Sequence, residues 1–241
     1  MEGAELSARF ALPPNSRSYC GTRKFADVFA AYLGDRSAKN LVALERALSS
    51  FRAHYAYLKM IAGANGRKQF DAKVTEALWL GNGLLKKVKR KDLQRMITSD
   101  FVGKGMLGAK RAEGLAVSLN GRFVAHHSFH TLYIHSITGV VPPTVKTSDN
   151  CRVGWGRVVK AREGAAIVKT QKLVRKGGKL LLLPCKKKWK LSCAGIELLQ
   201  GVKKGELVAS HWGVAVMKIT KGQAARLEKA TLQNMKAANR K

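Results

Sequence analysis

The sequence lacks the short motifs that mark the commonest enzyme classes. No P-loop, no His-Glu-x-x-His and no Gly-x-Ser-x-Gly pattern occurs. The glycine-rich run Gly103–Gly108 follows a predicted helix, whereas a phosphate cradle requires a preceding strand. These absences argue against nucleotide hydrolysis, zinc peptidase and serine hydrolase chemistry. A binding protein is therefore expected rather than an enzyme.

Cysteine and long apolar runs are also scarce. The four cysteines form no Cys-x-x-Cys pair, which argues against a zinc knuckle and a disulfide scaffold, so we expect reduced thiols. No apolar run approaches the roughly 20 residues that cross a bilayer, and Leu180–Leu183 is among the longest. The first ten residues contain acids and no apolar signal core. We expect a cytoplasmic protein without membrane association.

Acidic residues are few: 15 Asp and Glu stand against 45 Lys and Arg, for a formal net charge of +30. Residues 1–120 hold 21 basic and 10 acidic side chains, and residues 121–241 hold 24 and 5. Such an excess attracts polyanions: nucleic acid, an acidic membrane face or an acidic protein. A source whose proteins are generally basic would explain the same balance. Dense basic runs occur at Lys86–Lys91 and Lys186–Lys190.

Helical periodicity dominates the first 120 residues. Apolar residues recur at three- and four-residue spacing, and Ser37 can cap a helix. The predicted helices cover residues 22–33, 38–62, 71–89 and 92–101. Residues 10–21 contain two prolines, an asparagine and two serines, which predicts a turn or an extended entry segment.

Strand signals follow. Residues 123–141 are rich in aromatic and β-branched side chains, which favours a strand, and residues 142–150 predict a linker. After Asn150, short strands with turns about every ten residues indicate a barrel. Thr220 can cap a closing helix over Lys221–Ala238. The expected fold class is α+β: a mainly α-helical N-terminal domain of unknown role over residues 1–143, then a small OB-like β-barrel with a C-terminal helix over residues 150–241.

Two motifs bracket the expected barrel. Cys151 to Val158 reads Cys-Arg-Val-Gly-Trp-Gly-Arg-Val, and Gly205 to Ile219 reads Gly-Glu-Leu-Val-Ala-Ser-His-Trp-Gly-Val-Ala-Val-Met-Lys-Ile. They resemble the Cys-x-x-x-Pro-Gly-x-Val opening and the Gly-Asp-x-Val-x-x-His-x-Gly-x-Ala-x-x-Lys-Ile run of hydrogenase-assembly chaperones of the HypC/HupF type. Trp155 stands where that family has proline, and the cysteine is internal here rather than at the N-terminus.

This resemblance implies a barrel followed by a helix and a non-enzymatic role in hydrogenase maturation. In the family the cysteine is implicated in holding an iron that bears cyanide and carbon monoxide, so iron is the expected, transiently held cofactor. The implied ligands are Cys151 and His211, a thiolate and an imidazole that suit low-spin iron. The implied partner is the hydrogenase large subunit precursor or another maturation protein. The expected partner-binding residues lie in the two motifs: Trp155, Gly156, Trp212 and Gly213.

The chain as a whole also resembles an uncharacterised bacterial and archaeal family. The resemblance is carried by Phe10–Gly21 (FALPPNSRSYCG), Leu78–Leu85 (LWLGNGLL) and His127–His130 (HSFH), joined to the C-terminal module. It implies an association with nickel–iron hydrogenase genes and names no activity for the helical half.

Four histidines lie close together in the sequence: His126, His127, His130 and His135. On a strand, His127 and His135 share one face; on a helix, His126 and His130 form an i,i+4 pair. Packing at the junction of the domains and ligation of a bound iron complex are both open. We include His127 and His130 with Cys151 and His211 in the predicted metal site.

Alternative functions remain open. A basic β-barrel can bind single-stranded nucleic acid on an open face, and Trp155 and Trp189 lie beside basic residues. We expect such binding to be weak and non-specific. An enzyme built on the histidines is a third possibility.

If the protein binds a metal, Cys151 is the expected reactive thiolate, because Arg152 and Arg157 are near it in sequence. Cys185 and Cys193 are expected to be dispensable.

Overall fold

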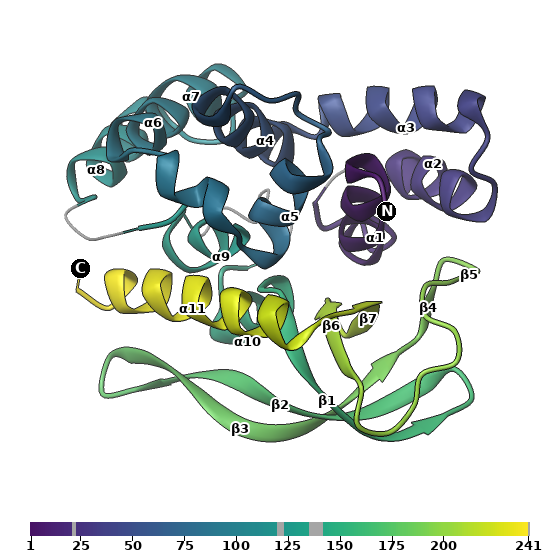
Figure 1. Ribbon diagram of the computed structural model, residues 1–241. Helices are drawn as coiled ribbons and strands as arrows, with labels where there is room; N and C mark the ends of the chain where they lie inside the picture. Colours follow the sequence, from purple (N-terminus) through teal and green to yellow (C-terminus); the bar gives the residue numbers. More distant parts are fainter. Residues whose placement is uncertain (21–22, 120–122, 135–141, 241) are drawn as a thin grey trace.

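The computed structural model describes residues 1–20, 23–119, 123–134 and 142–240. Helices form one layer, a small barrel forms the other, and the C-terminal helix α11 (Lys221–Ala238) lies between them (Figure 1). The helices of the first layer are α1 (Gly3–Asn15), α2 (Arg23–Gly34), α3 (Ala38–Ser50), α4 (Arg52–Asn65), α5 (Ala72–Leu80), α6 (Arg90–Arg95), α7 (Phe101–Gly103), α8 (Ala109–Val117) and α9 (His127–Phe129). The fold class is α+β, as predicted.

The first helix corrects the prediction for residues 10–15, which are helical and contain Pro13 and Pro14 in the last turn of α1. Every residue of α1 except Arg9 is buried. The prolines leave two carbonyl groups of the preceding turn without their usual i+4 donors. Burial of nearly the whole helix supplies the packing that outweighs this loss.

The remaining helices follow the predicted pattern with two corrections. Ser37 caps α3 through the backbone N–H of Asn40, as expected. The predicted helix over residues 38–62 is broken, because Phe51 has an extended backbone that separates α3 from α4. The third helix is shorter than predicted, because α5 ends at Gly81 and a 3₁₀ turn (Gly83–Lys87) follows.

The predicted strand over residues 123–141 is wrong where the chain is described. Residues 127–134 form α9 followed by a π-helical turn, His130–Ile134, and residues 135–141, which include His135, lie outside the described residues. The His126 side chain caps α9 by accepting the N–H of Ser128. The predicted linker is also helical: α10 (Val145–Cys151) starts from a capping box in which Thr144 accepts the N–H of Thr147.

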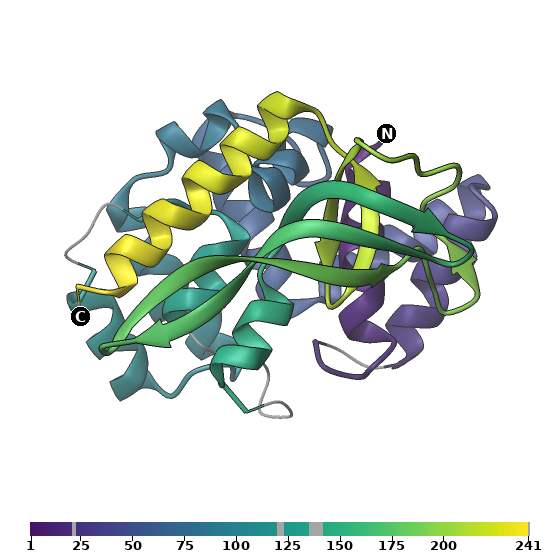
Figure 2. The same cartoon turned by 90° about the horizontal axis from the view of Figure 1, so that it is seen from below.

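The barrel consists of five strands in the order β1-β2-β3-β7-β6. Their bounds are β1 (Gly154–Arg162), β2 (Ala165–Lys176), β3 (Lys179–Lys190), β6 (Leu207–His211) and β7 (Val214–Lys218). β6 pairs back onto β1, while β3 and β7 meet through one parallel pair, Lys190 with Val214. The long β2–β3 hairpin extends beneath α11 (Figure 2). The basic residues 184–190 lie inside β3 rather than in a loop.

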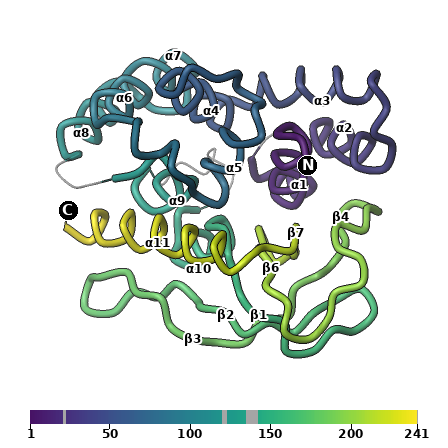
Figure 3. The backbone as a smooth tube through the Cα atoms, in the orientation of Figure 1, coloured from purple at the N-terminus to yellow at the C-terminus, as the bar shows by residue number. Residues whose placement is uncertain are grey.

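The largest hydrophobic cluster spans the helical layer and part of the barrel, and a second cluster fills the barrel interior. The chain leaves the helices through α10 and returns to them as α11, which packs against α5 and α9 (Figure 3). One buried cluster contains side chains of α1 and α5 together with Val214 and Val216 of β7. The predicted boundary between residues 143 and 150 falls at the start of α10. In the described part of the chain no helix combines the length and apolarity that a membrane span needs.

Candidate metal site

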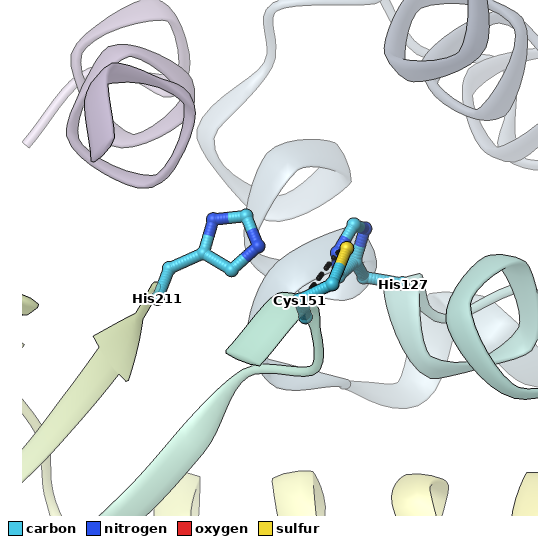
Figure 4. A group of neighbouring side chains, drawn as sticks. All are labelled: His127, Cys151 and His211. Atoms are coloured by element: carbon cyan, nitrogen blue, oxygen red, sulfur yellow. Dashed lines mark hydrogen bonds between the residues drawn. The ribbon is translucent and has the colours of Figure 1, made fainter. Parts of the chain in front are cut away.

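Three residues from separate elements converge beneath α1. His127 opens α9, Cys151 ends α10 and His211 ends β6. One potential ligand atom from each lies within 4.8 Å of those of the other two. Figure 4 shows the Cys151 thiol next to the His127 ring, with the His211 ring facing them from the end of β6. A thiolate and two imidazoles form a donor set typical of transition-metal sites.

The thiol of Cys151 faces polar groups although the residue is only 2% exposed. Its sulfur lies 3.8 Å from Nε2 of His127 and accepts a hydrogen bond from the Thr131 hydroxyl at 3.7 Å. The pKa of Cys151 lies well below its ordinary value. The main cause is a hydrogen bond with Cys20; the two imidazoles act in the same direction and burial opposes them. Of the two neighbouring thiols, Cys151 is therefore the more readily ionised, since the pKa of Cys20 is raised.

The arginines have no part in this effect, which corrects the predicted cause. Arg152 is only 2% exposed, and its guanidinium bonds to Asp149 at 2.9 Å and to the Gln171 carbonyl. Lys187 reaches the other oxygen of Asp149 at 2.6 Å. Arg157 donates to the Gly205 carbonyl on the exposed side of β1. Both arginines thus stabilise the barrel instead of the thiolate.

His211 is oriented by α1. Its Nδ1 lies 2.6 Å from the carbonyl oxygen of Phe10, and because a carbonyl only accepts, Nδ1 carries the proton. The Phe10 carbonyl is free for this bond because Pro13 and Pro14, at the i+3 and i+4 positions, lack N–H groups. In the described chain Nε2 of His211 makes no hydrogen bond. The proton on Nδ1 therefore leaves Nε2 as the nitrogen that can bind a metal.

His127 is held differently. Its Nε2 donates to the carbonyl oxygen of Cys151 at 2.9 Å, and the same nitrogen faces the Cys151 sulfur. The indole of Trp79 packs against both imidazoles, with ring centroids 4.5 Å from His127 and 5.5 Å from His211. Binding a metal through Nε2 would exchange the carbonyl bond for the metal bond.

A cavity of about 40 Å³ adjoins the three residues. A volume of this order holds a metal ion with a few water-sized ligands. Two buried donors that line it, the Tyr57 hydroxyl and Nε1 of Trp79, have no hydrogen-bond partner in the described chain. Buried donors without partners are costly, so a bound ligand that accepts hydrogen bonds would satisfy them. The lining is otherwise mostly apolar.

The other predicted histidine has a different place. His130 lines the same cavity, but its ring packs edge-on against Tyr57 and Phe101, and it is not among the three converging residues. His126 has a structural role: Nε2 bonds to the Trp79 carbonyl at 3.1 Å and Nδ1 to the Ser128 hydroxyl at 2.8 Å. His126 thus fits the packing alternative, and the ligand roles of His127 and His130 stay predictions.

The predicted partner-binding residues are divided between the surface and the interior. Trp155 is half-buried, with the Arg152 guanidinium 5.6 Å from its ring centroid. Gly156 is required by strand packing, because a Cβ there would collide with the Lys169 carbonyl. Trp212 is buried and forms the β6–β7 turn with Gly213; both have positive φ. The partner-binding role of all four stays a prediction.

Sequence reasoning missed Cys20, Trp79 and the Phe10 carbonyl. Cys20 and Trp79 line the cavity, and the Phe10 carbonyl orients His211. The sequence did contain a signal for the first two residues: each of the three segments that carry the whole-chain resemblance contributes residues to the cavity. They contribute Ala11, Pro14 and Cys20; Leu78 and Trp79; and His127 and His130.

The fold and the site define an α+β protein with a candidate transition-metal centre between its helical layer and its barrel. The chain belongs to a family of unknown function, DUF6390, which matches residues 1–241. No curated protein and no solved structure matches the chain.

Proposed function

We propose that this protein is a cytoplasmic, non-enzymatic assembly factor that holds a first-row transition metal at His127, Cys151 and His211. The observation that carries the proposal is the convergence of these three ligand atoms within 4.8 Å. They come from α9, α10 and β6, so the fold itself builds the site. The neutral tautomer of His211 and the low pKa of Cys151 provide donors in their metal-binding forms.

The donor set selects among metals. A thiolate with imidazoles suits zinc, copper and iron, whereas magnesium and calcium prefer oxygen ligands. No carboxylate lines the cavity within the described residues. With three protein ligands the metal would keep positions for ligands of its own. Tyr57 and Trp79, whose polar hydrogens have no partner among the described residues, line the space such ligands would occupy.

Holding a metal fits this site better than catalytic turnover does. Cys151 and His211 are buried, and the cavity admits small ligands rather than an organic substrate. The likeness of the two barrel motifs to HypC/HupF-type chaperones supports iron as the cargo. It also supports the hydrogenase large subunit precursor, or another maturation protein, as the recipient. Trp155 on the outer face is the proposed contact residue.

The proposal is tested by titrating the anaerobically reduced protein with Fe²⁺ and measuring bound metal after equilibrium dialysis. We expect one metal ion per chain, bound about 10–100-fold more weakly by His211→Ala and with unchanged affinity by Cys185→Ser. Cys185 lines a separate groove beside Lys169 and Lys186 instead of the cavity, and it serves as the control. Failure of the wild-type protein to bind Fe²⁺, Co²⁺ or Zn²⁺ more tightly than His211→Ala would contradict the proposal.

A second function is supported by the outer face of the barrel. Arg157, Lys169 and Lys186 lie side by side across β1, β2 and β3, and all three are exposed. Like charges directly opposite each other destabilise a sheet, and a polyanion would relieve that repulsion. A groove of about 500 Å³ runs past Lys169, Lys186 and Trp155.

We propose weak, non-specific binding of single-stranded nucleic acid at this groove, with bases stacking on Trp155. Trp189 has no part in it, because it is 3% exposed in the barrel core. This corrects its expected place beside the basic residues. Binding should have a Kd of roughly 10⁻⁴–10⁻⁶ M at physiological salt. Nanomolar binding there, lost in Trp155→Ala, would make nucleic acid the main partner.

A further inference from the structure

Cys20 lies beside the three converging residues. It follows α1 and packs against Cys151 and Trp212. It lines the same cavity as His127, Cys151 and His211. Both cysteines are free thiols, so no disulfide joins the two. A second thiol therefore borders the site from the side of the helical layer.

The backbone that presents Cys20 is held in a demanding conformation. Ser18 has φ 55°, in the left-handed region that non-glycine residues seldom adopt. This turn brings the N–H of Tyr19 to the Pro14 carbonyl at 3.0 Å. The Tyr19 ring then packs on Trp212, with centroids 4.6 Å apart. Such local strain persists where surrounding contacts fix it, and here those contacts direct Cys20 toward Cys151.

We propose that Cys20 is the fourth ligand of this site, completing a set of two thiolates and two imidazoles for a tetrahedral divalent first-row ion. This inference rests on the proposed metal binding at His127, Cys151 and His211. Tetrahedral sites with two sulfur and two nitrogen ligands are typical of zinc and are also accessible to ferrous iron and cobalt. The Cys20 thiol would lose its proton on binding.

The geometry requires a small adjustment. With metal–sulfur bonds of about 2.3 Å, two thiolates on a tetrahedral ion lie roughly 3.8 Å apart. Cys20 already packs beside Cys151, so the two side chains start as neighbours. Cys20 is not part of the group within 4.8 Å, so its side chain has to turn from Cys151 toward the imidazoles.

The remaining cysteines offer a matched control. Cys193 lies 3.4 Å from the Ser16 hydroxyl, and Cys185 lines the groove on the outer face of the barrel. Like Cys20, Cys185 is half-buried. Cys20→Ser and Cys185→Ser therefore remove the same sulfur atom from positions of similar burial, one inside the proposed site and one outside it.

The test uses Co²⁺ as the probe on the full-length, anaerobically reduced protein. X-ray absorption should count two sulfur ligands in the wild-type protein and one in Cys20→Ser. The thiolate-to-cobalt charge-transfer absorption should fall by about half in that variant. Its Co²⁺ affinity should fall at least about tenfold, since even an orienting group outside the ligand set contributes that much. Cys185→Ser should match the wild type in all three measurements.

The outcomes separate this inference from the proposed function. One sulfur ligand in the wild-type protein, with Cys20→Ser binding as tightly, would overturn the fourth ligand and leave the three-residue site intact. No Co²⁺ binding by the wild-type protein would overturn both. A Cys20–Cys151 disulfide in the loaded protein, seen as two missing free thiols, would also overturn it. The sulfur count on the wild-type protein decides the matter even if Cys20→Ser fails to fold.

Discussion

The barrel has two faces of opposite character. The face toward α1 carries His211 and closes a small cavity mostly lined by aromatic and apolar side chains. The outer face of β1–β3 carries Arg157, Lys169 and Lys186 in a row. The basic residues of the barrel are thus kept away from the thiolate, and the charge of the chain says nothing about its site. The proposed metal binding and the proposed attraction of a polyanion would then be separable properties of one small fold.

The largest expected effect is on the inner face. Cys151→Ala removes the thiolate and should lower Fe²⁺ or Co²⁺ affinity by at least about 100-fold, because the site is left with two converging imidazoles. The fold should persist, since alanine removes little volume. Dialysis measures the metal, and a filter-binding assay with single-stranded DNA reports the outer face. If DNA binding fell in parallel, the two faces would not be independent.

A smaller effect is expected from α1. In Pro14→Ala the new N–H can donate to the Phe10 carbonyl, which now orients His211. Loss of such an orienting bond typically costs about 10–100-fold in metal affinity. Pro13→Ala is the control, because its N–H lies opposite the Arg9 carbonyl instead. Equal affinities in the two variants would show that the Phe10 carbonyl does not set the tautomer.

Lowering the pH should destabilise the protein through its buried histidines, whereas the exposed lysines stay charged and contribute no change. Burial lowers the pKa of His54 to about 3, whereas an unfolded histidine titrates near about 6.5. Between these values the unfolded chain binds a proton that the native chain does not. The contribution of His54 to stability should therefore be complete above about pH 6.5 and fall by up to about 1.4 kcal/mol per pH unit below it.

Urea unfolding at pH 7 and pH 5 measures this slope. In His54→Phe the slope should be shallower, because one of the buried neutral histidines is gone. His126 has the same low pKa, about 3, so part of the slope should remain. A wild-type slope that His54→Phe leaves unchanged would mean that His54 is protonated in the native state.

The smallest effect concerns the outer face. Replacing Lys169 and Lys186 by glutamine should weaken binding of single-stranded DNA a few-fold and reduce its salt dependence. Two fewer phosphate contacts lower the slope of log K against log salt by about 1.4. Metal affinity should not change. An unaltered salt slope would mean that the polyanion binds elsewhere. Lys229→Gln on α11 is the control, because Lys229 lies outside the row of Arg157, Lys169 and Lys186.

The barrel and its closing helix could be predicted because their signals are local. Strand alternation, the Gly177–Gly178 turn and the Thr220 cap each act within a few residues, and the structure confirms them. The convergence of Cys151 and His211 could also be anticipated, since two motifs mark opposite ends of a barrel whose β1 and β6 are paired.

The wrong or missing predictions concern segments whose structure depends on contacts with distant parts of the chain. Pro13 and Pro14 argue locally against a helix, yet α1 is buried on nearly all sides. Residues 127–134 have strand-like composition, but the Asn234 side chain bonds to Val124 and Ser128 and holds this segment against α11. Cys20 carries no local motif, and its role depends on the turn at Ser18.

The burial of Cys151 has a consequence for exchange kinetics. An ion held at the proposed site, which α1, Trp79 and Trp212 cover, would be released only as fast as the surrounding chain opens. The dissociation rate should then level off as chelator concentration rises, because opening rather than competition limits it. Transfer to a recipient would need a partner that accelerates opening, so the long residence time of the ion would itself protect the cargo until that partner binds.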